Sequence, residues 1–407
     1  MHDKKTVLYI GNFAFPFGNA SGKRVYANGK ILRELGYEVL FVGTGKAVSD
    51  LELLKNTQDV YDGFNYYNIS YPKSNLDWIK YKKTFNDIEL FLKNKEIIND
   101  LCLIIYYGSP RLSIFNMMLI NFSHANKIKI LSDCVDWLTP KTNNVIFNII
   151  KWIDNTYQKA YANKKTDGII AISNYLSNYY KKSGLKTIII PPLSPVKFKC
   201  SESSYNFQHK KIITYAGQPF RIGKKVTDLK TLKDRIDKTI ILLHAAKVKG
   251  CVFIFNIYGF TKDEYLYTIP SQGKYIDELG DSICFHGLAP NEEVMESIVN
   301  SDFTILIRDV KRDTMAGFPT KVSESISCGT PVITTRTSDL EDYISEGENG
   351  FFIDFDEEKS LEELKNILSI DQKKVLEIKK NCIESQMFYY KNYENKLKDF
   401  LSLLNYQ

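Results

Sequence analysis

Short apolar runs recur along the whole chain and alternate with longer segments of helical periodicity. Runs that are apolar on both faces are typical of buried strands in parallel sheets, where helices cover the two sides. The pattern therefore predicts a doubly wound α/β architecture. The predicted strands are 6–10, 37–43, 101–107, 127–132, 167–172, 186–190, 211–216, 251–258, 282–286, 302–308, 330–334 and 350–355, and the predicted helices are 22–35, 141–163, 174–183, 291–300, 319–328 and 359–369.

A proline cluster divides the chain almost in half. Pro191, Pro192 and Pro195 lie close together, and proline disrupts both helix interiors and central strands. The 407 residues suffice for two domains, so we expect Rossmann-like domains over 1–193 and 194–385 that face one another across a hinge. The last stretch has helical spacing, and we expect 386–407 to form a helix that packs back on the first domain.

The two halves differ in charge. Residues 1–200 carry a net charge of +11 and residues 201–407 carry −5, which together give +6. A basic first half suits an anionic surface or substrate, although a nucleic-acid-binding protein is usually more basic, so we expect no nucleic-acid partner. Within 141–199, ten lysines oppose two aspartates. That segment suits an anionic membrane surface or a lipid-diphosphate acceptor, or else reflects an A·T-rich genome.

Cysteine usage and hydropathy indicate the compartment. The seven cysteines form no Cys-x-x-Cys pair, which favours core residues in a reducing environment. No segment reaches the roughly 18 apolar residues of a spanning helix, and the first apolar run is too short for a signal peptide. We expect a cytoplasmic protein, either free or peripheral at the inner membrane face. The histidines lack metal-ligand spacing, so no metal and no other cofactor is expected.

A glycine-rich loop follows the first predicted strand. Gly18, Ser21, Gly22 and Lys23 lie at the start of the next helix, where backbone amides can hold a phosphate or carboxylate. The spacing matches neither the dinucleotide-binding G-x-G-x-x-G pattern nor a Walker A loop. The loop is therefore interpreted either as an anion site or as an ordinary turn of an α/β domain.

A second glycine follows strand 211–216. Gly217 and Gln218 end this strand, and Lys224 and Lys225 come shortly after, where we expect them to open a helix. Lysines in that position neutralise a phosphate. The alternative is a solvated run of charges.

The most specific signal begins at Phe318. Pro319 suits the first turn of a helix, and the amides around Thr320 and Lys321 are expected to point at a diphosphate. Glu324 lies about one turn further on, where a carboxylate can accept hydrogen bonds from the two hydroxyls of a ribose.

This segment is similar to the carboxy-terminal signature of retaining family 4 glycosyltransferases. The family pattern has two glutamates separated by seven residues, and Glu324 matches the second, the ribose ligand. The resemblance extends over most of the chain, and its other parts are Gly18–Gly22, Gly217 with Lys224 or Lys225, His286-Gly287 and Asp302–Arg308. It implies the GT-B fold of two facing Rossmann-like domains, with the backbone at Gly287 near the nucleotide base.

The resemblance also implies a reaction. It is transfer of a hexose from a UDP- or GDP-sugar to a glycan or lipid-linked acceptor in polysaccharide biosynthesis, with retention and without the Asp-x-Asp metal site of the other glycosyltransferase fold. The departing phosphate helps to deprotonate the acceptor. Two departures are Ala316, where the family has its first glutamate, and Gln218, where it has an arginine. We expect Lys321, with Lys224 and Arg308, to supply the missing positive charge.

Asp136 is the candidate for the acceptor or sugar side. It follows strand 127–132 within Asp133-Cys134-Val135-Asp136-Trp137. Either aspartate binds sugar hydroxyls while Trp137 stacks on a sugar ring, or the aspartates cap a helix and the tryptophan lies in the core. We assign catalytic roles to Asp136 and Lys321. Alternative functions are a noncatalytic GT-B nucleotide-binding subunit and a sugar-nucleotide epimerase; a nicotinamide dehydrogenase lacks its glycine fingerprint here.

Overall fold

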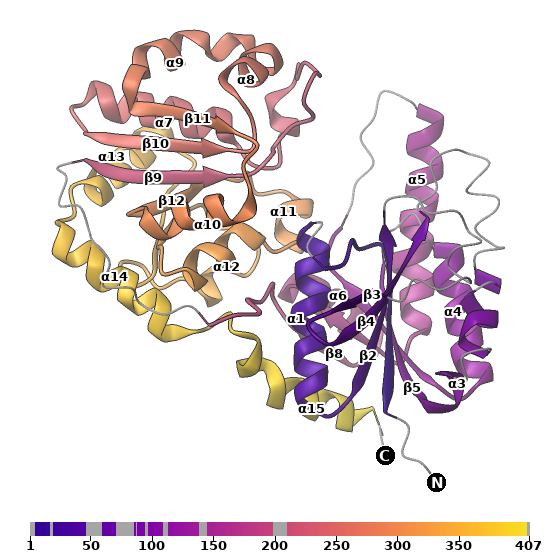
Figure 1. Ribbon diagram of the computed structural model, residues 1–407. Helices are drawn as coiled ribbons and strands as arrows, with labels where there is room; N and C mark the ends of the chain where they lie inside the picture. The colour runs from indigo at the N-terminus through magenta and orange to yellow at the C-terminus, as the bar shows by residue number, and fades with distance from the viewer. Residues whose placement is uncertain are drawn as a thin grey trace. The chain divides into compact units, whose positions relative to one another are not determined.

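The chain folds into two compact α/β units (Figure 1). Unit 1 comprises Met1–Pro195 with Tyr389–Gln407, and unit 2 comprises Val196–Phe388. This computed structural model describes residues 5–16, 19–45, 59–70, 85–86, 88–93, 97–108, 113–137, 145–197 and 210–404.

Unit 1 is built on an eight-stranded sheet with the order β3-β4-β2-β1-β5-β6-β7-β8. Every neighbouring pair is parallel except β3 with β4. The strands are β1 (Thr6–Gly11), β2 (Glu38–Gly45), β3 (Asp59–Tyr61), β4 (Phe64–Ser70), β5 (Leu101–Tyr107), β6 (Lys129–Cys134), β7 (Gly168–Ala171) and β8 (Thr187–Ile189).

Both faces of this sheet are buried, as the apolar runs predict. Along β1, Val7 and Tyr9 enter one core cluster, whereas Leu8 and Ile10 enter another on the opposite face. Helices α1 and α15 contribute to the first cluster and α4 to the second, and Figure 1 shows them on opposite sides of the sheet. The α-helices of unit 1 include α1 (Ala20–Glu34), α3 (Ile97–Asp100), α4 (Ser113–Ala125), α5 (Val145–Tyr157), α6 (Asn174–Lys181) and α15 (Glu394–Leu403).

Unit 2 has a six-stranded, fully parallel sheet with the order β11-β10-β9-β12-β13-β14. Its strands are β9 (Lys211–Ala216), β10 (Phe253–Tyr258), β11 (Ile283–Gly287), β12 (Phe303–Leu306), β13 (Val332–Thr334) and β14 (Gly350–Phe352). Its α-helices are α7 (Ile236–Val248), α8 (Lys262–Thr268), α9 (Gly273–Leu279), α10 (Asn291–Asn300), α11 (Arg312–Ala316), α12 (Thr320–Ser327), α13 (Glu357–Leu368) and α14 (Gln372–Ser385). The strand order reverses direction between β9 and β12, the position at which open parallel sheets bind ligands.

Each predicted strand is present, and the predicted doubly wound class is confirmed. The hairpin β3–β4 was not predicted, because its sequence is polar and lacks a continuous apolar run. The predicted helix 141–163 is interrupted within its described part: α5 gives way to a π-helical turn, Gln158–Ala162, and then to a 3-10 turn, Asn163–Lys165.

The carboxy-terminal segment returns to unit 1. Gln386 adopts a left-handed conformation that ends α14, and the chain then pairs with the interdomain segment through a hydrogen bond from the Tyr390 amide to the Ser194 carbonyl. The Tyr390 hydroxyl donates to Glu34 over 2.8 Å, and α15 packs against α1. Among the described helices, none combines the length and hydropathy needed to cross a bilayer.

Candidate functional site

A buried carboxylate organises the carboxyl edge of the unit 2 sheet. Asp234, in the loop before α7, receives hydrogen bonds from Lys321 Nζ at 2.8 Å, from Arg308 Nε at 2.7 Å and from the Tyr215 hydroxyl at 3.0 Å. Tyr215 belongs to β9, Arg308 follows β12, and Lys321 lies in the first turn of α12. The fold thus brings together two of the predicted phosphate-binding cations, Lys321 and Arg308.

Electrostatics keep this carboxylate ionised. Burial opposes the ionisation of Asp234, but the charges and hydrogen bonds of Lys321 and Arg308 outweigh that penalty, so its pKa is well below the usual range. Burial and the adjacent Asp234 charge raise the pKa of Tyr215, which therefore remains a hydroxyl donor. Two cations share one anion in this cluster, so a net positive charge remains at the sheet edge.

The two cations differ in accessibility. The side chain of Arg308 is 7% exposed, whereas that of Lys321 is 30% exposed. The backbone of Arg308 is also fixed, because its amide donates to the Thr335 hydroxyl and its carbonyl accepts from the same group. Lys321 is therefore the cation that can turn toward a ligand, while Arg308 holds Asp234 in place.

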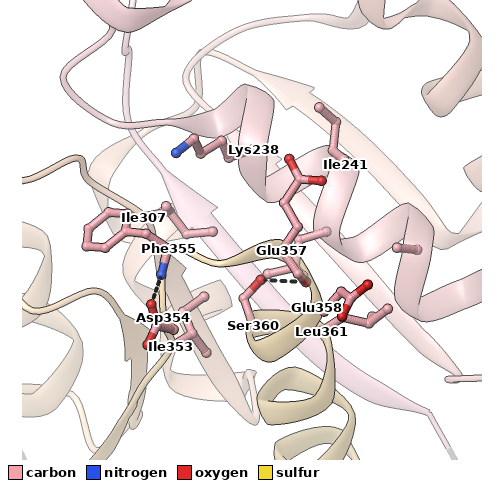
Figure 2. A pocket seen from close by; sticks show the side chains of 12 residues that line it. Lys238, Ile241, Ile307, Ile353, Asp354, Phe355, Glu357, Glu358, Ser360 and Leu361 are labelled. Carbon is pink, nitrogen blue, oxygen red and sulfur yellow. Dashed lines mark hydrogen bonds between the residues drawn. The ribbon is translucent and has the colours of Figure 1, made fainter.

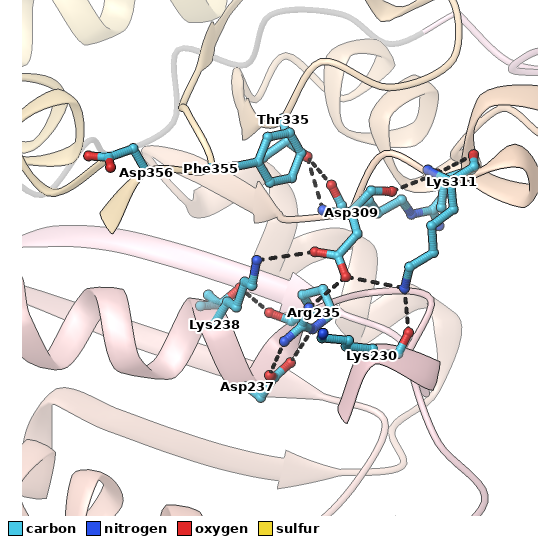
Figure 3. Close-up of polar contacts among 12 residues, drawn as sticks. Lys230, Arg235, Asp237, Lys238, Asp309, Lys311, Thr335, Phe355 and Asp356 are labelled. Carbon is cyan, nitrogen blue, oxygen red and sulfur yellow. Dashed lines mark hydrogen bonds and ion pairs between the residues drawn. The ribbon is translucent and has the colours of Figure 1, made fainter. Parts of the chain in front are cut away.

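A second set of ion pairs involves the residues that follow Asp234 and Arg308 in the sequence (Figure 3). Arg235 pairs with Asp237 at 2.7 Å and with Asp309 at 2.6 Å, and its amide donates to the Ile307 carbonyl. Hydrogen bonds from Arg235 and from Lys311 overcome the effect of burial and lower the pKa of Asp309 to about 2. Asp234 therefore pairs with Arg308, and the next residue, Arg235, pairs with Asp309. These two ion pairs link the segment before α7 to the segment after β12.

Glycines line the same edge. A Cβ atom on Gly217 would lie 2.2 Å from Cε of Lys321, so the lysine side chain crosses directly over this glycine. Gly259 has φ +117, and a Cβ there would lie 2.3 Å from the Gly217 carbonyl oxygen. The Gly259 amide donates to the Gly287 carbonyl at 2.7 Å. The ends of β9, β10 and β11 thus approach each other closely without side chains between them.

The amino terminus of α12 lies at this site. Pro319 is the N-cap residue and has no side-chain acceptor, and the first amides of an α-helix, here Thr320 and Lys321, lack intrahelical acceptors. Glu324 is half-buried and three residues beyond Lys321, so the two side chains share one face of the helix. Amides, a lysine and a carboxylate therefore occur together, as a diphosphate and a ribose require.

The neighbouring predicted residues have mixed surroundings. Phe318 is buried and packs edge-on against Tyr343 and Phe388, so its ring belongs to the core of unit 2. Ala316 is fully buried at the end of α11. Gln218 is exposed directly after the strand-end glycine.

The surroundings of Lys224 and Lys225 differ from the expectation. These lysines do not open a helix: they lie in an exposed loop that continues to α7 at Ile236. The amide of Lys224 closes a turn to the Arg221 carbonyl, and Lys225 Nζ lies 5.8 Å from the ring centre of Tyr267. Gly223 interrupts helical geometry here with φ +76.

One Asp-x-Asp triplet occurs in the sequence, at Asp354-Phe355-Asp356. Its carboxylates begin a helix: Asp356 caps α13 by accepting from the Lys359 amide, and Asp354 pairs with Lys359 Nζ at 2.5 Å. Among the residues that the structure describes, no group of three His, Cys, Asp or Glu could hold a metal ion.

The triplet borders a cavity of about 280 Å³ beside α7 and α13 (Figure 2). Apolar side chains such as Ile241, Ile307 and Phe355 line it, with Lys238 and Glu358 also at its wall. The residues that line this cavity include none of the predicted site residues.

In unit 1, Asp133 is part of a buried ion pair. Arg24 contacts it through Nη2 at 2.7 Å and Nε at 3.0 Å, and the Tyr9 hydroxyl donates to it at 2.5 Å. Arg24 also donates to the Ile190 carbonyl at 2.7 Å. Asp133 is fully buried, so we assign it a structural role instead of binding to sugar hydroxyls.

Asp136 is half-buried just beyond β6 and lies near other candidates. Burial and the charges of Asp133 and Asp136 raise the pKa of the Tyr107 hydroxyl, which also has a hydrogen bond with Ser21. Ser21, Tyr107 and Asp136 therefore gather at the carboxyl ends of β1, β5 and β6. Trp137 packs edge-on against Tyr179 at 4.8 Å, and Lys159 Nζ lies 4.1 Å from its ring centre.

The glycine-rich loop has a helix cap. Asn19 caps α1 and accepts from the Gly22 amide at 3.0 Å, while the amide of Lys23 donates to the Asn19 carbonyl. A Cβ on Gly22 would lie 2.1 Å from the Ala14 carbonyl oxygen, so close packing requires glycine here. Gly18 lies outside the described residues.

Sequence reasoning missed Asp234 and Gly259. Asp234 lies in a segment of mixed charge without a motif, and only tertiary contacts pair it with residues 74 and 87 positions away. A signal existed for Gly259, because it directly follows a predicted strand in the same way as Gly217.

Comparisons with known proteins concern the family and the fold. Residues 273–385, which include α12, match the family model described as glycosyl transferases group 1. No curated protein sequence matches the chain.

Solved structures match along nearly the whole length. Sucrose-phosphate synthase from Thermosynechococcus elongatus has a TM-score of 0.70 at 13% identity, over 98% of this chain and 99% of that one. HepE from Anabaena in complex with UDP and glucose has a TM-score of 0.60 at 15% identity, with the same coverage. The lipopolysaccharide outer core galactosyltransferase WaaB has a TM-score of 0.61 at 17% identity, again over 98% and 99%.

At these identities the structural likeness establishes the fold, which is GT-B. The family match applies to a segment of the second unit. Residues 273–385 carry a glycosyltransferase group 1 domain on a chain with the GT-B fold, and the protein is a glycosyltransferase enzyme.

Proposed function

We propose that the protein is a retaining glycosyltransferase that moves a hexose from a UDP- or GDP-sugar to a glycan or lipid-linked acceptor without a metal ion. The observation that carries the proposal is the convergence of Lys321 and Arg308 on Asp234 at the carboxyl edge of unit 2, with Lys321 in the first turn of α12. A nucleotide diphosphate is the ligand that such a set of donors recognises.

The chemistry requires stabilisation of the leaving nucleotide diphosphate as the bond to the anomeric carbon breaks. Lys321 can turn from Asp234 toward a phosphate oxygen, and the amides of Thr320 and Lys321 can donate hydrogen bonds to the other oxygens. The acceptor hydroxyl attacks from the face that the phosphate leaves, and the departing phosphate oxygen takes the hydroxyl proton. This course retains the anomeric configuration and needs no protein nucleophile.

The other candidates have supporting roles in this proposal. Glu324 accepts hydrogen bonds from the ribose hydroxyls, because it shares the helix face of Lys321. The backbone at Gly287 contacts the base, and Gly217 leaves room for the Lys321 side chain that binds the diphosphate. In unit 1, Asp136 binds hydroxyls of the acceptor or of the transferred sugar, with Ser21 beside it.

The substrates are inferred from chemistry and from neighbours. HepE, a structural neighbour, was crystallised with UDP-glucose, and WaaB is described as a galactosyltransferase of lipopolysaccharide. A similar donor, an acceptor in surface polysaccharide synthesis and action at the cytoplasmic membrane face are proposals for this chain. The excess of lysine in 141–199 supports a membrane-side location.

Nucleotide titration tests the donor site. Isothermal titration with UDP, GDP and ADP should show binding of at least one diphosphate, and Lys321→Met should weaken it by about 1–3 kcal/mol. Lys274→Met is the control, because Lys274 belongs to α9, is 81% exposed and is not among the predicted site residues. If no nucleotide binds, or if both substitutions have the same effect, the site is wrong.

Turnover tests the reaction. A screen of nucleotide sugars should reveal slow hydrolysis of one donor without an acceptor, and the released sugar should keep its anomeric configuration. Conversion of the donor to another sugar nucleotide would instead identify an epimerase.

A further inference from the structure

Helix α5 exposes a continuous apolar face. Val145, Ile149, Trp152 and Ile153 follow the i, i+4, i+7, i+8 spacing of one helix face, and their exposed fractions are between 54% and 69%. Ile150 and Tyr157 extend the face. Soluble helices with this spacing bury such a face, so something outside the described part of the chain is expected to cover it.

The opposite side of the helix is polar and points inward. Asn155 is 1% exposed and Gln158, in the following π turn, is 3% exposed. Gln158 Nε2 donates to Asn163 Oδ1 at 2.6 Å, and the Ser113 hydroxyl of α4 donates to Asp154. These contacts fix the rotation of α5, so its apolar side cannot turn toward the protein interior.

The surface around this face is basic and aromatic. Over 145–165 there are four lysines and one aspartate. Tyr157 and Tyr161 lie together with ring centres 5.2 Å apart, and Lys165 Nζ lies 5.3 Å from the ring centre of Tyr161. Apolar side chains bordered by lysine, tyrosine and tryptophan are typical of helices that lie in the interface of a bilayer.

We propose that the exposed face of α5 docks into the headgroup region of a membrane that contains anionic lipids. Figure 1 shows the amino-terminal half of α5 extending beyond the strands of unit 1. At 13 residues the helix is about 20 Å long, which is too short to span a bilayer, so it lies on the membrane. Excess positive charge favours an anionic membrane over a second copy of the chain, because two copies would bring like charges together.

Vesicle flotation of the full chain tests this docking. The probes are vesicles of phosphatidylcholine alone and of phosphatidylcholine with an equal amount of phosphatidylglycerol, at low and high salt. The variant Ile149→Ser/Trp152→Ser/Ile153→Ser removes the centre of the face, and Val248→Ser/Val252→Ser is the matched control, because those valines are 70% and 54% exposed in unit 2. The α5 variant lacks Trp152 but keeps Trp78 and Trp137, so the difference in tryptophan emission between it and the wild type reports whether Trp152 enters an apolar environment.

The wild type and the control should float with the anionic vesicles, with a blue shift of tryptophan emission, and the α5 variant should bind roughly tenfold more weakly or worse. Binding should also weaken at high salt. Equal binding by the α5 variant, or no wild-type binding at low salt, overturns the proposal. The proposal is also overturned if sedimentation velocity shows a dimer for the wild type and a monomer for the α5 variant, because then a second copy covers the face.

The docking proposal can fail independently of the catalytic one. It rests on the proposed function only in placing a lipid-linked acceptor at the same membrane. UDP titration of the α5 variant should match the wild type, which also shows that the variant is folded. Nucleotide binding without vesicle binding refutes the docking alone, and vesicle binding without nucleotide binding refutes the donor site alone.

Discussion

Replacement of Asp234 by asparagine is the sharpest test of the unit 2 site. The substitution keeps the size of the side chain and removes its charge. Arg308, 7% exposed, and Lys321, 30% exposed, would then lie at the sheet edge without their shared counter-ion. Loss of one partner from a buried ion pair typically costs about 3–5 kcal/mol. Asparagine still accepts one hydrogen bond, so we expect about 3 kcal/mol lower free energy of unfolding at pH 7.

Urea unfolding followed by circular dichroism measures this loss, with Asp277→Asn as the control. Asp277 pairs with Lys262 at 3.2 Å, but its side chain is 73% exposed, so its removal should change stability by less than about 0.5 kcal/mol. A deficit for Asp234→Asn within about 1 kcal/mol of the control would refute the assignment of Asp234 as the organising charge.

The pH dependence has a definite sign. The pKa of Asp234 is lowered in the folded protein, so its stabilising contribution is present above the unfolded pKa of about 4 and is lost as the pH falls through the folded value. The difference between wild type and Asp234→Asn should therefore stay constant from pH 5 to 8 and shrink only below about pH 4.

Saturating UDP separates a structural from a ligand-related role. A diphosphate restores negative charge beside Lys321 and Arg308, so UDP should raise the melting temperature of Asp234→Asn more than that of the wild type. An equal shift in both proteins would contradict the proposed contact between Lys321 and the diphosphate.

Four further substitutions test separate parts of the structure. Glu324→Ala should weaken nucleotide binding by about 1–3 kcal/mol through the loss of charged hydrogen bonds to ribose, and unchanged affinity in isothermal titration would remove Glu324 from that role. Gly217→Ala should displace the Lys321 side chain and weaken UDP binding roughly fivefold with little loss of stability. Gly259→Ala should lower the free energy of unfolding by about 2 kcal/mol or more, because the φ of Gly259 is +117 and a Cβ there would meet backbone atoms. Burial raises the pKa of Asp154 to about 7, so the folded state binds this proton more tightly, and stability falls as the pH rises from about 4 to 7. Asp154→Asn should abolish that part of the pH dependence. At pH 8 it should be more stable than wild type by about 1–2 kcal/mol, because the partly exposed Asp154 side chain is only partly desolvated. Urea unfolding at pH 5 and pH 8 measures this difference.

The sequence was sufficient for the elements that rest on local patterning. Strands buried on both faces, such as β1 and β9, read as apolar runs whatever surrounds them. The edge hairpin β3–β4 was missed because an edge strand tolerates polar residues. Helix α12 was found because Pro319 and Gly329 mark its ends.

The sequence by itself determined the doubly wound class, because periodicity acts over a few positions. It also predicts a division near the proline cluster and a nucleotide-binding segment around Lys321 and Glu324. Only the tertiary structure decided that Asp234 joins Lys321 to Arg308, that Asp133 is bound to Arg24, and that α5 turns its apolar face outward. These outcomes depend on which distant groups share a buried site, and burial determines the energy of a charge or an apolar surface. Local sequence does not encode that environment.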